Sequence, residues 1–81
     1  MKHKVIIYSA EWCPWCVRVK EWLKLHKVPF EERDVDKDEQ AAKEVVEKSG
    51  DEGIPVIDVD GKIIKGFDRD ALKAALGITE D

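Results

Sequence analysis

Short apolar runs and helical patterns alternate along this 81-residue chain. Residues 5–8 (Val-Ile-Ile-Tyr) form a continuous apolar run, which is typical of a strand buried on both faces of a sheet. From Pro14 to about Lys27, apolar side chains recur at helical spacing and predict an amphipathic helix. The apolar positions of this helix are Cys16, Val19, Trp22 and Leu23. Pro29 ends the helix, because the residue before a proline is pushed out of the α region.

The middle of the chain predicts a second strand and a second helix. Residues 30–35 alternate loosely and are rich in charge, which favours a strand near the sheet edge. Asp36 is expected to cap the following helix, with Glu39 completing a variant of the capping box. Gly50 is the expected left-handed stop. The apolar stripe of this helix consists of Ala41, Ala42, Val45 and Val46.

The last part of the chain predicts a hairpin and a final helix. Residues 54–59 and 62–64 are apolar and flank Asp60-Gly61, a dipeptide typical of a tight hairpin turn. The last helix is expected from a cap at Asp68 to Gly77. The order is therefore βαβαββα, in which the first two strands are parallel and the hairpin adds an antiparallel edge. These patterns predict an α/β fold with a four-stranded mixed sheet flanked by three helices. We expect residues 1–81 to form a single domain.

Composition and charge exclude several classes of function. The net charge of −4 and the absence of a basic block argue against a protein that binds nucleic acid. No apolar run approaches the roughly 20 residues of a membrane span. We therefore expect a monomeric cytoplasmic protein, in a compartment where thiols are kept reduced.

The two cysteines stand where the first strand gives way to the first helix. Cys13 and Cys16 are at positions i and i+3, which lie on one helix face at a separation that a disulfide accepts. Pro14 suits the first helical position and leaves Cys13 at the helix N-terminus, where free N–H groups favour a thiolate. We predict that Cys13 attacks a disulfide and that Cys16 resolves the mixed disulfide.

Other interpretations of the cysteine pair remain open. A structural disulfide would close a loop of only about four residues and would stabilise the fold little. A zinc site requires about four ligands, whereas His26 lies about 15 Å beyond Cys16 along the helix and His3 about 17 Å away at the far end of the first strand. Both histidines are expected at the surface. A metal or iron-sulfur cluster shared between two chains, or an interaction domain with inert thiols, would use the same residues differently.

Three motifs together carry a family resemblance. Cys-Pro-Trp-Cys follows the first strand, Gly53-Ile54-Pro55 precedes the third, and Gly66-Phe67-Asp68 precedes the last helix. In this order they resemble the glutaredoxin branch of the thioredoxin fold, over nearly the whole chain. The resemblance implies a dithiol thiol-disulfide oxidoreductase that takes part in electron transport and cell redox homeostasis.

The resemblance also implies roles for individual residues. Cys13 would be the nucleophile, Cys16 the resolving thiol, and Pro55 a cis-proline packed beside them that presents the backbone of Ile54 to an extended peptide. Gly66 and Asp68 match the loop that holds the γ-glutamyl end of glutathione in true glutaredoxins. The predicted substrate-binding residues are Trp12, Pro14, Trp15, Ile54, Pro55, Gly66, Phe67 and Asp68. Trp22 is expected in the core.

For the reductant and the substrate, the resemblance implies a set of candidates and not a single molecule. Family members that use glutathione usually carry a lysine where this chain has Ala10. The Gly66-Phe67 form looks more like the small glutaredoxin-like hydrogen donors of ribonucleotide reductase, which are recharged by thioredoxin reductase. We therefore expect no bound cofactor, no metal, and glutathione or a thioredoxin reductase as the external reductant. The expected substrate is a protein or low-molecular-weight disulfide, with ribonucleotide reductase among the candidates.

Overall fold

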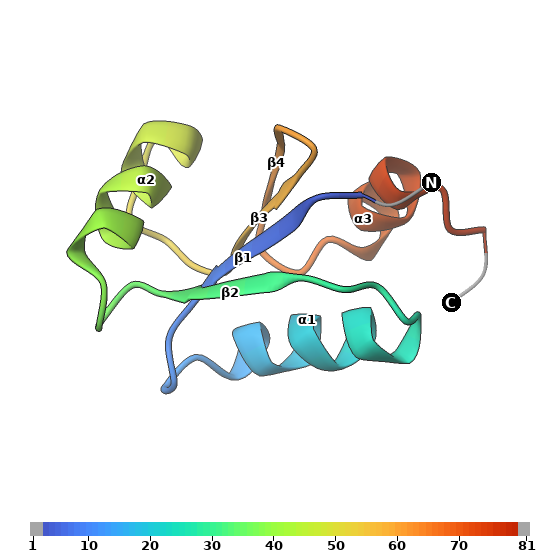
Figure 1. Ribbon diagram of the computed structural model, residues 1–81, viewed down its shortest axis with the longest axis horizontal. Helices are drawn as coiled ribbons and strands as arrows, with labels where there is room; N and C mark the ends of the chain where they lie inside the picture. Colours follow the sequence, from blue (N-terminus) through green and yellow to red (C-terminus); the bar gives the residue numbers. More distant parts are fainter. Residues whose placement is uncertain (1–2, 80–81) are drawn as a thin grey trace.

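A four-stranded mixed sheet lies between helices on both of its faces (Figure 1). The structure, a computed structural model, describes residues 3–79. The order of elements is βαβαββα, as predicted. In chain order they are β1 (Val5–Ser9), α1 (Pro14–Leu25), β2 (Glu31–Asp34), α2 (Glu39–Ser49), β3 (Val56–Val59), β4 (Lys62–Lys65) and α3 (Arg69–Leu76).

The order of strands in the sheet is β2-β1-β3-β4, with the apolar β1 in the interior and the charged β2 at an edge. Strand β1 pairs in parallel with β2 and antiparallel with β3, and β3 pairs antiparallel with β4. Tyr8, near the end of β1, lies opposite Val56, at the start of β3. The residues that follow β1 therefore lie beside those that precede β3.

Alternation along the strands divides the core between the two faces of the sheet. Ile7 and Ile57 face α1 and α3, whereas Tyr8 and Val56 face α2. The larger cluster includes Trp22, which is buried as predicted. In Figure 1, α1 and α2 lie on opposite sides of β1, in agreement with this division. None of the helices within the described residues has the length and apolar character that crossing a bilayer requires.

Helix α2 begins later than predicted, because Asp38 and not Asp36 is its cap. The Asp38 side chain accepts hydrogen bonds from the N–H groups of Gln40 and Ala41, and its backbone is extended. Asp34 holds the preceding turn, since its carboxylate accepts the N–H of Asp36 at 2.9 Å and its carbonyl accepts the N–H of Asp38 at 3.0 Å. The capping-box prediction was therefore wrong by two residues, and the side chain of Asp36 is available for another contact.

The apolar stripe of α2 is narrower than predicted. Ala41 and Val45 are fully buried, but Ala42 is only half-buried and Val46 is 43% exposed. The short β2 strand beneath this helix ends at Asp34, so the sheet offers it little further apolar surface. The stop at Gly50, with φ of 88°, is confirmed.

Other element boundaries shift by one or two residues. Helix α1 ends at Leu25, because Lys27 adopts a left-handed φ of 57°. Strand β3 begins at Val56, after the two residues that were predicted to start it. The cap of α3 is Asp68 as predicted, with its carboxylate accepting the N–H of Ala71 at 3.1 Å.

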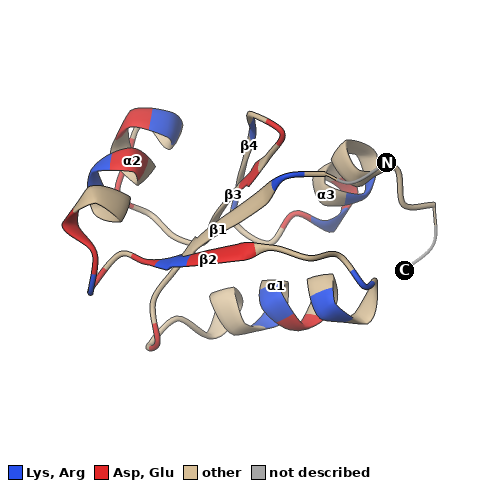
Figure 2. Ribbon diagram, in the orientation of Figure 1, with Lys and Arg blue, Asp and Glu red and all other residues tan. Residues whose placement is uncertain are grey.

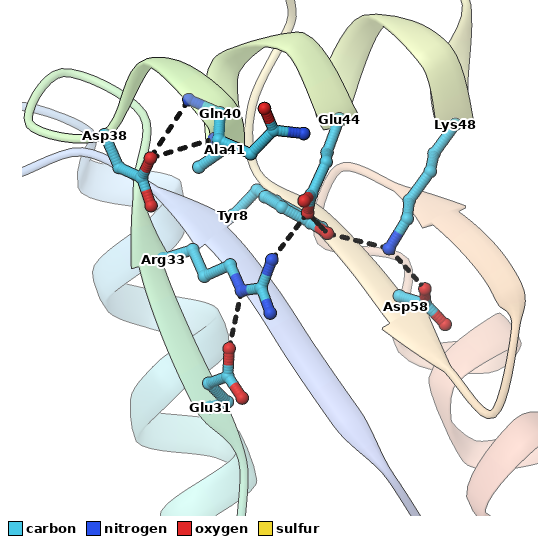
Figure 3. Close-up of polar contacts among 9 residues, drawn as sticks. All are labelled: Tyr8, Glu31, Arg33, Asp38, Gln40, Ala41, Glu44, Lys48 and Asp58. Atoms are coloured by element: carbon cyan, nitrogen blue, oxygen red, sulfur yellow. Dashed lines mark hydrogen bonds and ion pairs between the residues drawn. The ribbon is translucent and has the colours of Figure 1, made fainter.

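A polar network fastens α2 to the sheet (Figure 3). The buried Tyr8 hydroxyl donates to Glu44 at 2.6 Å and accepts from Lys48 at 2.7 Å. The Lys48 ammonium also donates to Asp58 at 2.7 Å, and Arg33 donates to Glu44 at 2.7 Å. Burial, together with the hydrogen bond to Glu44, raises the pKa of Tyr8, so the hydroxyl keeps the proton that it donates.

Replacing Lys48 by methionine tests this network. Lys48→Met keeps the apolar stem of the side chain but leaves the largely buried Asp58 without its cation, and we expect a loss of roughly 2 kcal/mol in the free energy of unfolding. Urea unfolding followed by circular dichroism measures the loss. The exposed Lys43 of the same helix supplies the control, since Lys43→Met is expected to change stability by less than about 0.5 kcal/mol. Equal effects of the two substitutions would show that the network adds nothing.

Candidate active site

Cys13 caps helix α1. Its backbone is extended, Pro14 occupies the first helical position, and its Sγ accepts the N–H of Cys16 at 3.2 Å. Both cysteines are free thiols in this structure. A backbone donor at a helix N-terminus stabilises negative charge on the sulfur that accepts it. The predicted placement of the pair, one turn apart on the same face, is therefore confirmed.

The two thiols differ in their surroundings. Cys16 is fully buried, whereas Cys13 keeps 4% of its surface exposed. Burial, reinforced by the hydrogen bond with Cys13, raises the pKa of Cys16 to about 12. At neutral pH, Cys16 is thus a protonated thiol held behind Cys13.

An apolar groove lies next to the cysteines and has a volume of about 320 Å³. Its lining consists of Trp15, Ile54, Pro55, Gly66 and Phe67. These residues come from three separate segments, and all of them were predicted from the sequence. The Ile54–Pro55 peptide bond is cis, as predicted. The N–H of Gly66 donates to the carbonyl of Pro55 at 2.8 Å, which holds two of these segments together.

Three of the predicted substrate-binding residues, Trp12, Pro14 and Asp68, lie outside the lining of this groove. Pro14 occupies the first position of helix α1. Asp68 serves as the cap of α3. Trp12 lies on the other side of Ile54, where its indole N–H donates to Asp36 at 2.6 Å and its ring is 67% exposed. Trp15 is 57% exposed, with the guanidinium of Arg18 at 5.3 Å from its ring centroid.

A second hollow, the acidic groove, was not predicted from the sequence. Its volume is about 230 Å³, and it is lined by Trp12, Val35, Asp36, Ala42, Glu52 and Ile54. The predicted order of the strands could have indicated this groove. Strand β2 runs parallel to β1, so the acidic residues that follow β2 lie at the same edge of the sheet as the cysteines.

The histidines take no part in this site. His3 contacts Asp60 at 2.6 Å, and the ring of His26 lies 4.4 Å from that of Trp22. Both histidines are partly exposed, as expected for residues at the surface, and the His3 side chain keeps 33% of its surface accessible. Within residues 3–79, no group of three or more His, Cys, Asp or Glu side chains is arranged to hold a metal ion.

Comparison with known proteins identifies the family. Residues 5–64 match the Glutaredoxin family. The chain belongs to this family. A glutaredoxin-like 8.6 kDa protein from the rubredoxin operon of Clostridium pasteurianum is 41% identical over 63 residues, which cover 78% of this chain and 84% of that protein. The glutaredoxin-like protein NrdH of Lactococcus lactis subsp. lactis is 35% identical over 63 residues, covering 78% of this chain and 86% of the relative.

A solved structure gives the same result. The thioredoxin-like protein BC3987 superposes with a TM-score of 0.83 at 35% identity, covering 89% of this chain and 99% of that one. The predicted thioredoxin fold is thus confirmed. As a member of the glutaredoxin family, the protein is a thiol-disulfide oxidoreductase.

The difference between the two thiols is open to a direct test. We expect iodoacetamide to alkylate Cys13 at least about tenfold faster than Cys16 at pH 7, because the reagent attacks the thiolate and the pKa of Cys16 is raised to about 12. Peptide mapping of the reduced protein by mass spectrometry measures both rates. Cys13→Ser should leave a protein that reacts hardly at all before unfolding, and unfolding in urea should restore reactivity at Cys16. Similar rates at the two cysteines in the native protein would contradict this assignment.

Proposed function

We propose that Cys13 is the nucleophile and Cys16 the resolving thiol of this oxidoreductase. The observation that carries the proposal is the hydrogen bond from the Cys16 N–H to the Cys13 sulfur at the start of α1. The Cys13 thiolate attacks one sulfur of the substrate disulfide, and the other substrate sulfur leaves as a thiolate. Cys16 then loses its proton and attacks the sulfur of Cys13, which releases the substrate sulfur still bound there as a thiolate. Two electrons have then passed to the substrate, and a Cys13–Cys16 disulfide remains.

The apolar groove is the proposed seat of the substrate. An extended peptide passing over Ile54 would pack its apolar side chains against Trp15 and Phe67. These two aromatic residues would exclude water around the mixed disulfide. Pro14 keeps the helix start rigid, and Pro55 with Gly66 forms the floor of the groove.

The proposed substrate is a disulfide-containing protein, with ribonucleotide reductase as one candidate. The support for that candidate is the resemblance of the Gly66-Phe67 segment to the small hydrogen donors of that enzyme, together with the 35% identity to a protein named NrdH. We place the protein in the cytoplasm as a monomer, with its electrons supplied by an external thiol donor. The cysteines themselves carry the electrons, so no bound cofactor is required.

Trapping experiments test the roles of the two cysteines. Cys16→Ser should accumulate a mixed disulfide between Cys13 and a substrate peptide, because no resolving thiol is present to release it. Cys13→Ser should form no such adduct and should lose at least about a thousandfold in disulfide reduction. Mass spectrometry of the non-reduced protein identifies the adduct. An adduct on Cys16 in the Cys13→Ser variant, formed as fast as the Cys13 adduct in the Cys16→Ser variant, would refute the assignment.

The external donor is open to the same kind of test. We expect a thioredoxin reductase to reduce the Cys13–Cys16 disulfide faster than glutathione does. Ala10 offers no cation to a glutathione carboxylate, and the neighbouring groove carries two acidic side chains. Thiol titration after incubation of the oxidised protein with each donor and NADPH, with glutathione reductase in the glutathione arm, gives the two rates. Faster reduction by glutathione would assign the protein to the glutathione-dependent members of its family.

A further inference from the structure

The lining of the acidic groove combines apolar side chains with carboxylates. Trp12, Val35, Ala42 and Ile54 supply apolar surface, whereas Asp36 and Glu52 supply carboxylates. A long cationic side chain has the same division, with an apolar stem and a charged head. The exposed face of the Trp12 ring is a further favourable surface for a cation.

Among residues 3–79, no cationic side chain is paired with either carboxylate of the groove. One oxygen of Asp36 accepts the indole N–H of Trp12. Within the part of the chain that the structure describes, no ion pair includes Asp36 or Glu52. Figure 2 shows acidic residues in the segment between β2 and α2 and at the start of α2. Asp36, which lines the groove, belongs to this segment.

Two lysines close to these segments are engaged in ion pairs. Lys37 pairs with Glu11 at 2.7 Å, and Lys65 pairs with Asp51 at 2.9 Å. Both pairs are exposed, and neither contributes a lining residue of the groove. The lining itself holds two carboxylates and no basic residue, which places negative charge directly beside Ile54.

We propose that the acidic groove binds a lysine or arginine residue that directly adjoins the reactive cysteine of a protein substrate. This inference rests on the proposed function and names the substrate class: disulfides in basic segments of proteins. The cationic head would contact the carboxylates of Asp36 and Glu52, and its stem would pack on Trp12.

The position of Ile54 explains why the acidic groove would recognise a residue directly next to the substrate cysteine. Ile54 lines both grooves, and these lie on opposite faces of the sheet, with Trp15 and Phe67 on one side and the α2 residue Ala42 on the other. Successive side chains of an extended segment point to opposite sides. When the substrate cysteine points towards Cys13 on the α1 face, the residues on either side of it point into the acidic groove.

Three peptide disulfides test the proposal. Each is a symmetric dimer of acetyl-Gly-Xaa-Cys-Xaa-Gly-amide with Xaa as Lys, Gln or Glu, so that either direction of binding presents the same side chain. The pre-reduced protein is mixed with each dimer, and the second-order rate of one turnover is followed by tryptophan fluorescence and chromatography of the released thiol. Rates with a small uncharged thiol, 2-mercaptoethanol, correct for the intrinsic reactivity of each dimer.

The corrected rate for the Lys dimer is expected to exceed that for the Glu dimer by about fivefold or more at low salt, and salt should reduce the ratio. The double variant Asp36→Asn with Glu52→Gln should bring the ratio below about twofold, while asparagine still accepts the Trp12 N–H. The matched control is Glu21→Gln with Glu47→Gln, which removes the same charge from outside the groove and should keep the wild-type ratio.

The outcomes separate the inference from the proposed function. A wild-type ratio near one, with the Gln dimer still reduced, overturns the inference and leaves the dithiol chemistry intact. A ratio that survives in the groove variant, or falls equally in the control variant, assigns the preference to net charge and also overturns it. If reduced wild-type protein reduces none of the three dimers, the proposed function fails and the inference fails with it.

Discussion

The antiparallel pairing of β1 with β3 is the constraint on which the site depends. Because Tyr8 lies opposite Val56, the chain leaves β1 towards Cys13 at the place where it enters β3 through Pro55. The tight turn between β3 and β4 then returns Gly66 to the carbonyl of Pro55. One register thus brings together three segments that are distant in sequence. A shift of this register by one residue would separate the cysteines from the groove beside them.

The two faces of the sheet pack against their helices in different ways. The face towards α1 and α3 is apolar, and it supports the helix that carries the cysteines. The face towards α2 adds a polar network, in which Tyr8 and Asp58 of the sheet are joined through Lys48. Such a network is directional, because its donors and acceptors match in only one arrangement. It fixes the position of α2, and with it one wall of the acidic groove.

Local signals were sufficient for most elements of the fold. The Asp60-Gly61 turn, the Asp68 cap and Pro14 at the start of α1 each act within a few residues, and the structure confirms them. The cap of α2 could not be chosen locally, because Asp36 and Asp38 both have suitable side chains. The choice depends on Asp34, which organises the turn, and on Trp12, which binds Asp36 from another segment. The acidic groove escaped prediction for the same reason, since it combines residues from α2 and three loops.

The sulfur of Cys13 has two simultaneous duties, as the cap of a helix and as the atom that exchanges electrons. A sulfur in a disulfide is a poorer hydrogen-bond acceptor than a thiolate, so oxidation weakens the cap while it closes the link to Cys16. Folding and oxidation therefore form a closed thermodynamic cycle. The dithiol and disulfide forms can differ in their free energy of unfolding. Through ΔG = −nFΔE, this difference corresponds to a difference in reduction potential between the folded and the unfolded chain. The reduction potential of the cysteine pair is thus a property of the entire fold. A substitution far from either cysteine changes it whenever that substitution stabilises one redox form more than the other.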